Sequence, residues 1–438
     1  MAARSFTLSF VGDVMLGRLV DQLLPQHVEN WHEHHVASHF VERHPSLLGK
    51  GNYTASSPWG TALPLLRDSD LTLINLETAA TTTNDPWPHK AFNYRMHPAN
   101  IAPVLHAVGV DYAGLANNHV LDFGTEGLVE TVWALKAARV AFAGAGETTD
   151  EARRPAVLQL PRQEPGRHAP SQSPLPYPVH VYSASDHPRD WGPVPTFHLL
   201  DYSPATRVRL RTLLLSGGPR AHPVDTDEHF SPSPSEPDGD SEPHHHHPRH
   251  SFHHHHTRRT SSTLPAPALK IFSVHWGPNY SWHPSDRIRS LAHFLIDECD
   301  VDIVHGHSSH HVQGVERYHG KLIIYGCGDF VDDYALHEDY RNDLGAVWRV
   351  VVKERDEGVQ SSPSRDGIER GSRGLLLDRL EIFPTRIDRF RATLLDVDDE
   401  DHVWVRKKIA ALSRELGTGA RKELGGQGQV VVDLGEGS

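Results

Sequence analysis

The residues that could do chemistry in this chain are histidines, carboxylates and an asparagine at the ends of apolar runs. The plainest case is the stretch 301–310, Val-Asp-Ile-Val-His-Gly-His-Ser-Ser-His, in which an apolar strand runs into a glycine and closely spaced histidines. A tight turn after a strand presents two imidazoles, those of His307 and His310, to one point, as a divalent ion requires. The stretch therefore predicts a metal site at a strand end.

Four other segments carry a matching oxygen or imidazole at the tip of an apolar run. They are Phe10-Val-Gly-Asp13, Ile74-Asn-Leu-Glu77, Leu115-Ala-Asn-Asn-His119 and Val274-His275-Trp-Gly277. A hydrolytic metal centre needs anionic oxygens, imidazoles and an open position at which a water is activated. The predicted ligands are Asp13, Glu77, Asn118, His275, His307 and His310. If two ions bind, the glutamate is the candidate bridge between them.

Further residues are candidates for proton transfer and for substrate binding. His119 stands one residue beyond a predicted ligand and is free to protonate a leaving group, while Asp122 can fix its tautomer from the adjoining turn. Arg18, Arg95 and His97 could bind an anionic group of a substrate, because a guanidinium matches carboxylate or phosphate with two hydrogen bonds. For the two arginines a surface ion pair is an equal alternative.

Each predicted ligand also has an ordinary structural interpretation. Asp13 could hydrogen-bond its own turn, Glu77 could cap the following segment, and Asn118 could hold the turn before a helix. His275, beside a tryptophan, could be a core histidine. We favour ligation because five separate loops offer suitable atoms. Such a ligand set suits one or two divalent ions of manganese, zinc or iron alike.

Strands and helices alternate along the chain and would position these residues. Apolar residues alternate over 6–10, which predicts a strand that delivers the first carboxylate, and 71–74 predicts a second that delivers the glutamate. Apolar spacing over 128–135 and 288–295 is that of helices, and 301–304 predicts a further strand. This alternation predicts an α/β fold with its site at strand ends.

The domain prediction is one domain over 1–438 that carries a proline-rich and histidine-rich insertion. More than half of the 32 prolines lie between residues 161 and 268, and two runs of four histidines fall within the inner part of that segment. Such a composition cannot form a packed core. The prediction comprises ordered parts at about 4–216, 268–353 and 374–416, a disordered insertion at 217–267, a polar loop at 354–373 and a flexible tail at 417–438.

Composition narrows the classes of function. The net charge of −13 argues against a nucleic-acid partner, because phosphate neutralisation requires a basic face. Cys299 and Cys327 are the two cysteines, so no disulfide framework is expected and a reducing compartment fits. The N-terminal segment reaches a glycine and an aspartate too soon for a signal peptide or a membrane span. We expect a cytoplasmic protein without a membrane span.

In sequence order, the motifs resemble those of the poly-γ-glutamate capsule biosynthesis protein family of the CapA type. The motifs are Gly12-Asp13-Val-Met-Leu-Gly-Arg18, Asn75-Leu-Glu77, Asn117-Asn-His119, His275-Trp-Gly277 and Gly306-His-Ser-Ser-His310. The resemblance implies a calcineurin-like metallophosphoesterase fold. That fold is a four-layer α/β sandwich in which two facing mixed β-sheets are flanked by helices, and loops at one edge hold two metals.

Three departures from the general metallophosphoesterase pattern bear on the reaction. Met15 stands where the Asp-x-His pair has its histidine, Glu77 stands for the bridging aspartate, and the histidines after Gly306 are three apart instead of two. A thioether is a poor ligand for a hard ion. We therefore expect a metal-dependent hydrolase of phosphoester or amide bonds in an anionic small molecule or polymer. The alternative is a non-catalytic, metal-containing binding or assembly protein for an anionic polymer, and a weaker interpretation makes the insertion a metal store.

Overall fold

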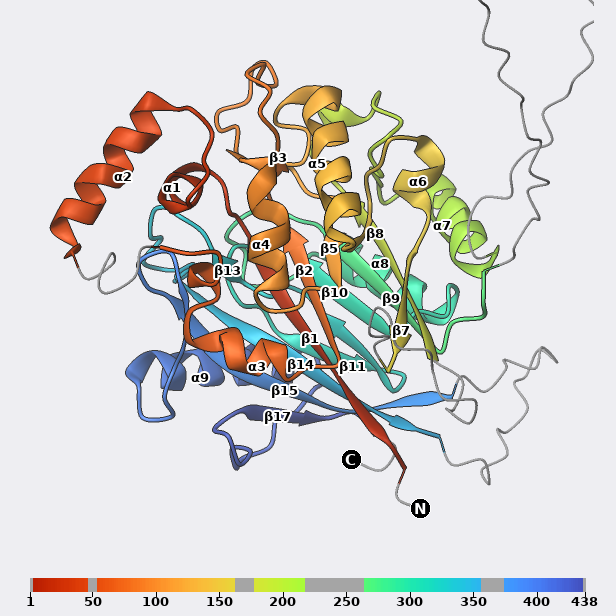
Figure 1. Cartoon of the computed structure of the whole chain (residues 1–438). Coiled ribbons are helices and arrows are strands. Elements are labelled where there is room, and N and C mark those ends of the chain that lie inside the picture. Colours follow the sequence, from red (N-terminus) through yellow and green to blue (C-terminus); the bar gives the residue numbers. More distant parts are fainter. Residues whose placement is uncertain (1–2, 46–52, 162–176, 217–263, 356–373, 436–438) are drawn as a thin grey trace, which may run out of the picture. The chain divides into compact units, whose positions relative to one another are not determined.

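Two β-sheets form the centre of the fold (Figure 1). The computed structural model describes residues 3–45, 53–161, 177–216, 264–355 and 374–435. The predicted insertion at 217–267 and the predicted loop at 354–373 therefore fall almost entirely outside the described residues. Both sheets belong to the unit formed by residues 1–219 and 265–438.

The first sheet has the strand order β16-β15-β14-β1-β2-β5-β6, and β13 and β17 pair with β1 and β15 beside this path. Its strands are β1 (Ser5–Val14), β2 (Leu71–Leu76), β5 (Tyr112–Gly114), β6 (Ala141–Ala143), β13 (Asp329–Val331), β14 (Leu344–Glu354), β15 (Leu375–Ile387), β16 (Ala392–Leu394) and β17 (Val430–Asp433). The run β1-β2-β5-β6 is parallel, whereas β14 to β17 are antiparallel. The sheet is therefore mixed.

The second sheet has the order β11-β12-β10-β9-β8-β7 and is also mixed. Its strands are β7 (Ala156–Leu160), β8 (Tyr177–Ser185), β9 (Leu269–His275), β10 (Ile303–His307), β11 (Val315–Tyr318) and β12 (Lys321–Ile324). The four strands β8, β9, β10 and β12 run parallel, with antiparallel neighbours at both edges. A small ladder joins β3 (Ala79–Ala80) to β4 (Arg95–Met96).

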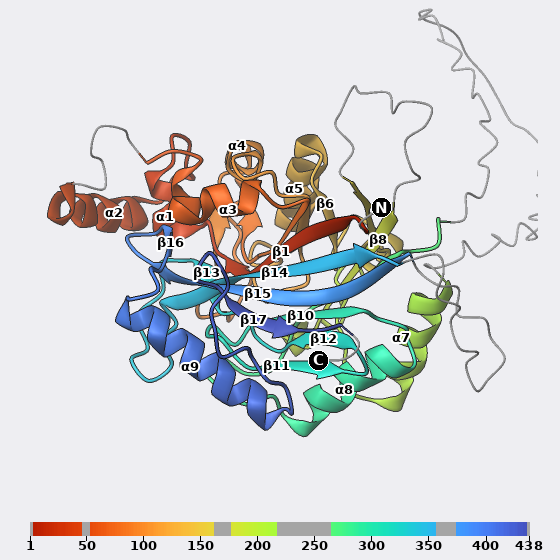
Figure 2. The ribbon, with the colours of Figure 1, turned by 90° about the horizontal axis from the view of Figure 1, so that it is seen from below.

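Helices cover the outer faces of both sheets, as Figure 2 shows in edge view. The helices of the described residues are α1 (Arg18–Leu23), α2 (Trp31–Arg43), α3 (Leu63–Arg67), α4 (Ile101–His106), α5 (Gly124–Ala138), α6 (Thr149–Arg153), α7 (Pro204–Ser216), α8 (Asp286–Asp297) and α9 (Glu400–Glu415). Helix α9 differs from the helices on the outer faces, because its Val405 and Ile409 belong to the core between the sheets. Helices α1, α3, α4 and α5 lie over the first sheet, and α7 and α8 lie over the second. Short 3-10 turns occur at Ser57–Ala62, Pro98–Asn100 and Arg189–Trp191.

Large buried side chains fill the space between the two sheets. Phe10, Leu73 and Trp348 from the first sheet pack with Ile271 and Ile303 from the second, and all five are fully buried. One further apolar cluster lies between the first sheet and its helices, and another lies between the second sheet and its helices. The predicted α/β sandwich of two facing mixed sheets flanked by helices is confirmed.

A serine at the start of α8 shows how a local sequence signal sets a helix end. The Ser285 side chain accepts a hydrogen bond from the Ile288 amide and caps α8. One expectation is wrong: part of the flexible tail predicted at 417–438 is the strand β17, whose apolar residues Val430 and Val432 are buried against β15. The segment Val430–Asp433 is too short to show periodicity in the sequence. It forms a strand because its backbone pairs with β15.

The inter-sheet core yields a prediction for stability. Replacement of Trp348 by alanine is expected to lower the free energy of unfolding by about 3–5 kcal/mol, because a fully buried indole is removed from the core. Urea titration of the purified protein measures this change. The matched control is Trp31→Ala on α2, where the side chain is 79 % exposed and the expected change is within about 0.5 kcal/mol. Equal losses in both variants would contradict the assigned core.

Candidate metal centre

The site residues lie where strands of the two sheets end. Asp13 stands at the end of β1, Glu77 directly follows β2, and Asn118 follows β5. In the facing sheet, His275 ends β9 and pairs in parallel register with His307 at the end of β10. Because parallel strands carry their carboxyl ends to one edge, both sheets deliver these side chains to the same region.

A bulge in β1 aims the first carboxylate. The register between β1 and β2 shifts between Phe10 and Asp13, so the alternation of the strand is broken just before the site. Gly12 occupies the bulge, and a Cβ atom there would lie 1.9 Å from the carbonyl oxygen of Gly328. Only glycine fits this close approach of two backbones.

The turn after β10 brings two histidines to the same point. Ser308 has φ 95° and His310 has φ 60°, a left-handed conformation that side chains other than glycine rarely adopt. Backbone of this kind persists where its surroundings fix it, commonly at functional sites. Here it places His310 with its Nδ1 2.9 Å from Asp329 Oδ1 and 3.6 Å from Asp13 Oδ2.

Two groups of potential metal-binding atoms result. Among the described residues, Asp13, His275 and His307 form one group and Asp13, Glu77 and His310 form another, with the ligand atoms of each group within 4.8 Å of one another. Every member is at most 5 % exposed. Five of the six predicted ligands are therefore brought together.

The sixth predicted ligand, Asn118, sits at the rim of the site. It is half-buried, and its Oδ1 accepts no hydrogen bond from the residues that the structure describes. Its backbone oxygen instead accepts a hydrogen bond from Lys90. An amide oxygen without a donor is available as a neutral ligand.

Hydrogen bonds from surrounding side chains orient the potential ligands. Asn75 Nδ2 donates to Asp13 Oδ1 over 2.7 Å, and Ser273 Oγ lies 3.1 Å from His307 Nε2. The same hydroxyl lies 3.1 Å from Nδ1 of His305, whose Nε2 is 3.0 Å from the carbonyl oxygen of Val11. His305 is thus a core histidine that bridges the two sheets, and such support fixes the rings that coordinate a metal.

Glu77 is the most unusual group of the site. It is 0 % exposed, and neither carboxylate oxygen accepts a hydrogen bond from any residue that the structure describes. Burial, together with the neighbouring carboxylates of Asp13 and Asp329, raises the pKa of Glu77 well above its ordinary value. A buried carboxylate without donors requires a proton or a cation.

Burial has the opposite effect on the imidazoles. It lowers the pKa of His275 and of His307 well below the ordinary value, and the charges of neighbouring histidines act in the same direction. Both rings are therefore neutral at pH 7, which is the form that binds a metal. Neutral imidazoles beside unsatisfied carboxylate oxygens form a donor set that fits a divalent ion.

Comparison with known proteins identifies the family of this chain. The family described as bacterial capsule synthesis protein PGA_cap matches residues 7–334, a span that includes every predicted site residue. The chain belongs to this family. A protein of Mycobacterium tuberculosis strain H37Rv, named as a probable polyglutamine synthesis accessory protein, is 31% identical over 424 residues, covering 94% of this chain and 92% of that one.

Two proteins named CapA are similar to this chain at lower identity. The capsule biosynthesis protein CapA of Bacillus anthracis is 23% identical over 75% of this chain and 60% of its own, and the PGA biosynthesis protein CapA of Bacillus subtilis is 23% identical over 74% and 63%.

Among the residues that the structure describes, no helix has both the length and the apolar character needed to cross a membrane.

In this PGA_cap chain, the predicted proton-transfer pair is in contact. His119 Nδ1 lies 2.6 Å from Asp122 Oδ2, its Nε2 lies 4.0 Å from Glu77 Oε1, and its ring stacks on Tyr94 with centroids 4.0 Å apart. Burial lowers the pKa of His119 to about 4, although Asp122 acts in the opposite direction. Nδ1 also lies 3.1 Å from Lys90 Nζ, which is a donor, but the shorter contact with the acceptor Asp122 Oδ2 favours the proton on Nδ1. The open atom is then Nε2, the nitrogen nearer to Glu77.

The three predicted substrate-binding residues differ in their placement. Arg18 pairs with Asp333 over 3.4 Å and lies over the ring of Tyr94, which stacks on the proton-transfer histidine. Arg95 instead donates to Asn84 Oδ1 over 2.8 Å, and His97 accepts a hydrogen bond from the amide of Ala99. Of the three, Arg18 is therefore the residue that is linked to the centre, through Tyr94 and His119.

Sequence reasoning missed three residues that shape the site. Asn75 orients Asp13 and reaches the centre through the pairing of β2 with β1. Lys90 donates to Asp122 Oδ1 and to the backbone oxygen of Asn118, although its surrounding loop has no periodic pattern. The third, His187, follows β8, and its ring centroid lies 5.0 Å from that of His275. Asp329 is different, because the sequence Gly-Cys-Gly-Asp-Phe predicts an aspartate that stabilises the turn of the site, and it contacts His310 there.

Met15, the departure seen in the sequence, is fully buried. Its sulfur accepts a hydrogen bond from the amide of Gly17 over 3.2 Å. The methionine therefore stabilises the turn at the start of α1. The nearby group of Asp13, Glu77 and His310 contains a single imidazole.

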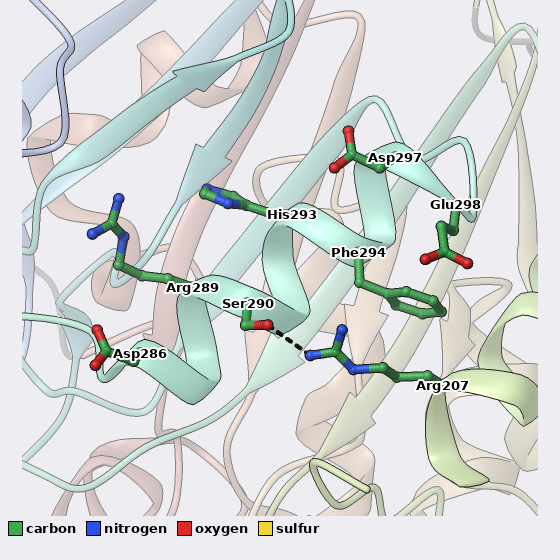
Figure 3. Close-up of a pocket in the computed structure, with 8 residues that line it drawn as sticks. All are labelled: Arg207, Asp286, Arg289, Ser290, His293, Phe294, Asp297 and Glu298. Atoms are coloured by element: carbon green, nitrogen blue, oxygen red, sulfur yellow. Dashed lines mark hydrogen bonds between the residues drawn. The ribbon is translucent and has the colours of Figure 1, made fainter. Parts of the chain in front are cut away.

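A separate surface hollow of about 410 Å³ lies between α7 and α8 (Figure 3). Arg207 of α7 donates to Ser290 Oγ of α8 over 2.8 Å at this place, and Arg289 and Asp297 also line it. None of the predicted site residues lines the hollow. The hollow belongs to the contact between α7 and α8 and lies apart from the metal centre.

The buried histidines predict a loss of stability in acid. Burial lowers the pKa of His305 to about 4 from an ordinary value of 6.5, so the unfolded chain binds more protons than the folded chain between these values. Stability is present in full above pH 6.5 and falls as the pH falls towards 4. His305→Gln is expected to reduce this slope by up to about 1.4 kcal/mol per pH unit in chelator-treated protein.

Urea titrations at several pH values measure the slope. The control is His283→Gln, because that side chain is 63% exposed and pairs with Glu415 at the surface. An unchanged slope in the His305 variant would show that this ring is charged in the folded protein.

The contacts of Lys90 predict strong coupling to Asp122. Lys90→Met leaves a buried carboxylate without its cation and is expected to destabilise the protein by about 3 kcal/mol. Asp122→Asn in the same chain removes the unpaired charge, so the double variant is expected to recover about 1–3 kcal/mol relative to the sum of the single changes. A double-mutant cycle by urea unfolding measures this coupling. Additive effects within about 0.5 kcal/mol would show that the two groups do not interact.

Proposed function

We propose that this PGA_cap protein is a metal-dependent hydrolase with a calcineurin-like metallophosphoesterase arrangement. The observation that carries the proposal is the Glu77 carboxylate, which is buried without a donor between Asp13 and neutral imidazoles. Loops from both sheets converge around this carboxylate. A structural ion pair would need a single partner, whereas this arrangement supplies several ligands around one point.

The ligands divide between two positions. Asp13, Glu77 and His310 would hold one divalent ion, and Asp13, His275 and His307 would hold the other, with Asn118 Oδ1 at the rim. Manganese, zinc or iron fits this set. When bound, such ions would supply an activated water and neutralise developing negative charge.

The residues of the chain supply proton transfer and orientation. His119 holds its Nδ1 proton on Asp122 and presents Nε2 on the same side as Glu77, where it can give a proton to a leaving group or take one from an incoming group. Tyr94 stacks on the ring and fixes its plane. Positioning of this kind is effective because the group needs no rearrangement before it reacts.

The class of substrate is inferred from the names of relatives and from the rim of the site. Relatives are named for polyglutamine synthesis and for capsule or PGA biosynthesis, which supports an anionic polymer or its fragments as the ligand. Arg18 lies at the rim and is 29% exposed in its side chain. A guanidinium there can bind either a carboxylate or a phosphate.

One observation favours the second candidate, a metal-containing binding or assembly protein without turnover. Because the Met15 sulfur is committed to the Gly17 amide, the position with Asp13, Glu77 and His310 has one imidazole fewer than the general metallophosphoesterase pattern. A weakly held ion at that position would leave binding intact and remove catalysis.

Elemental analysis tests the metal centre directly. The purified protein is expected to contain one or two equivalents of divalent metal, and the double variant His307→Ala, His310→Ala is expected to lose them, because each position loses an imidazole. In this double variant, the loss of metal is expected to lower turnover of a generic phosphodiester or of poly-γ-glutamate at least about 100-fold.

Two controls accompany this measurement. His283→Gln changes an exposed histidine, and a chain without residues 217–263 removes the histidine tracts. Both are expected to keep the metal. Equal metal in the wild type and the double variant would refute the proposed centre, and metal retained without turnover would favour the binding or assembly protein.

A further inference from the structure

A second histidine-aspartate pair flanks the centre from the side of the second sheet. His187 follows β8, which lies beside β9 in parallel register with Ser185 opposite His275. The rings of His187 and His275 have centroids 5.0 Å apart. The centre therefore lies between His119 with Asp122 from one sheet and His187 with Asp186 from the other.

The orientation of His187 is fixed by its aspartate. Asp186 Oδ1 contacts His187 Nδ1, while Asp186 Oδ2 accepts hydrogen bonds from the Tyr202 hydroxyl over 2.6 Å and from the Gly277 amide over 3.0 Å. Two donors already hold the carboxylate, so it does not depend on the histidine for its position. The imidazole has its Nδ1 committed to Asp186 and is left with Nε2 as its open atom.

Exposure separates His187 from three histidines of the predicted site. The side chain of His187 is 27% exposed, whereas those of His119, His275 and His307 are 7%, 1% and 0% exposed. His187 also belongs to neither of the two groups of potential ligands found among the described residues. On the side of the second sheet, His187 is therefore more accessible than His275 to a molecule that arrives from solvent.

We propose that His187 is a substrate-contacting residue whose Nε2 donates a hydrogen bond to an anionic oxygen of the bound molecule. The inference rests on the proposed function for the anionic character of that molecule. A phosphate or a carboxylate offers the same oxygen acceptor. Because Asp186 accepts from Nδ1, Nε2 donates only when the ring carries both protons, and a carboxylate on one side of the ring with an anion on the other favours that form. Arg18 binds on the side of the first sheet, so the two residues would hold a ligand from opposite sides.

The test compares anion binding with metal content in His187→Gln. Inorganic phosphate and a short γ-linked glutamate oligomer are titrated by calorimetry into the wild type and the variant, each in metal-loaded and chelator-treated form. We expect binding of at least one anion to weaken about tenfold in the variant, the loss of one charge-assisted hydrogen bond, while metal content stays at the wild-type level. Where turnover is measurable, KM is expected to rise with little change in kcat.

The control is His283→Gln, for which unchanged binding is expected. A variant that loses metal as well would make His187 a ligand and overturn the inference, and so would binding equal to that of the wild type. A wild type that holds metal but binds neither anion also overturns it and leaves the metal centre standing. A different result would be that the purified wild type holds no metal, yet binds phosphate more tightly than His187→Gln does. That result would refute the metal-dependent hydrolase and support the role of His187.

Discussion

A carboxylate that is removed from water and meets no donor must be neutralised, and the Glu77 side chain imposes this condition on the whole site. The neighbouring carboxylates of Asp13 and Asp329 make the condition more severe, because each adds negative charge to the same buried volume. Neutral imidazoles cannot relieve it by themselves. The arrangement is stable only with a bound proton or cation, and several ligand atoms pointing to one place favour the cation.

The rest of the fold can be understood as the means of holding that charge. Two sheets must face each other so that imidazoles from one meet carboxylates from the other, and the apolar core between them keeps the strand ends in register. The glycine at the bulge of β1 and the left-handed backbone at Ser308 and His310 are locally unfavourable. They are maintained because strongly packed strands on both sides leave the connecting turns little freedom.

The sequence pattern was sufficient for the α/β class and for most of the residues that the structure brings together, for a definite physical reason, whereas the two facing sheets were expected from the family resemblance. An apolar strand that ends in a polar residue is a local pattern, and parallel strands bring such ends together whatever the details of the loops. Lys90 and Asn75 act through partners that are far apart in the chain, so no local pattern marks their roles. The strand β17 was missed for a related reason, because its pairing with β15 decides its structure.

The two groups of potential ligands differ in chemistry, and this difference bears on what the centre can do. One holds two carboxylates and one imidazole, which is the harder set, and the other holds one carboxylate and two imidazoles. Met15, which stands where the general metallophosphoesterase pattern has a histidine, offers the harder set no imidazole. Asp13 belongs to both groups, so an ion at either position would withdraw negative charge that the other would otherwise meet. The affinities of two bound ions would therefore be coupled, and the harder position, with its unsatisfied glutamate, would have the greater electrostatic need for a cation.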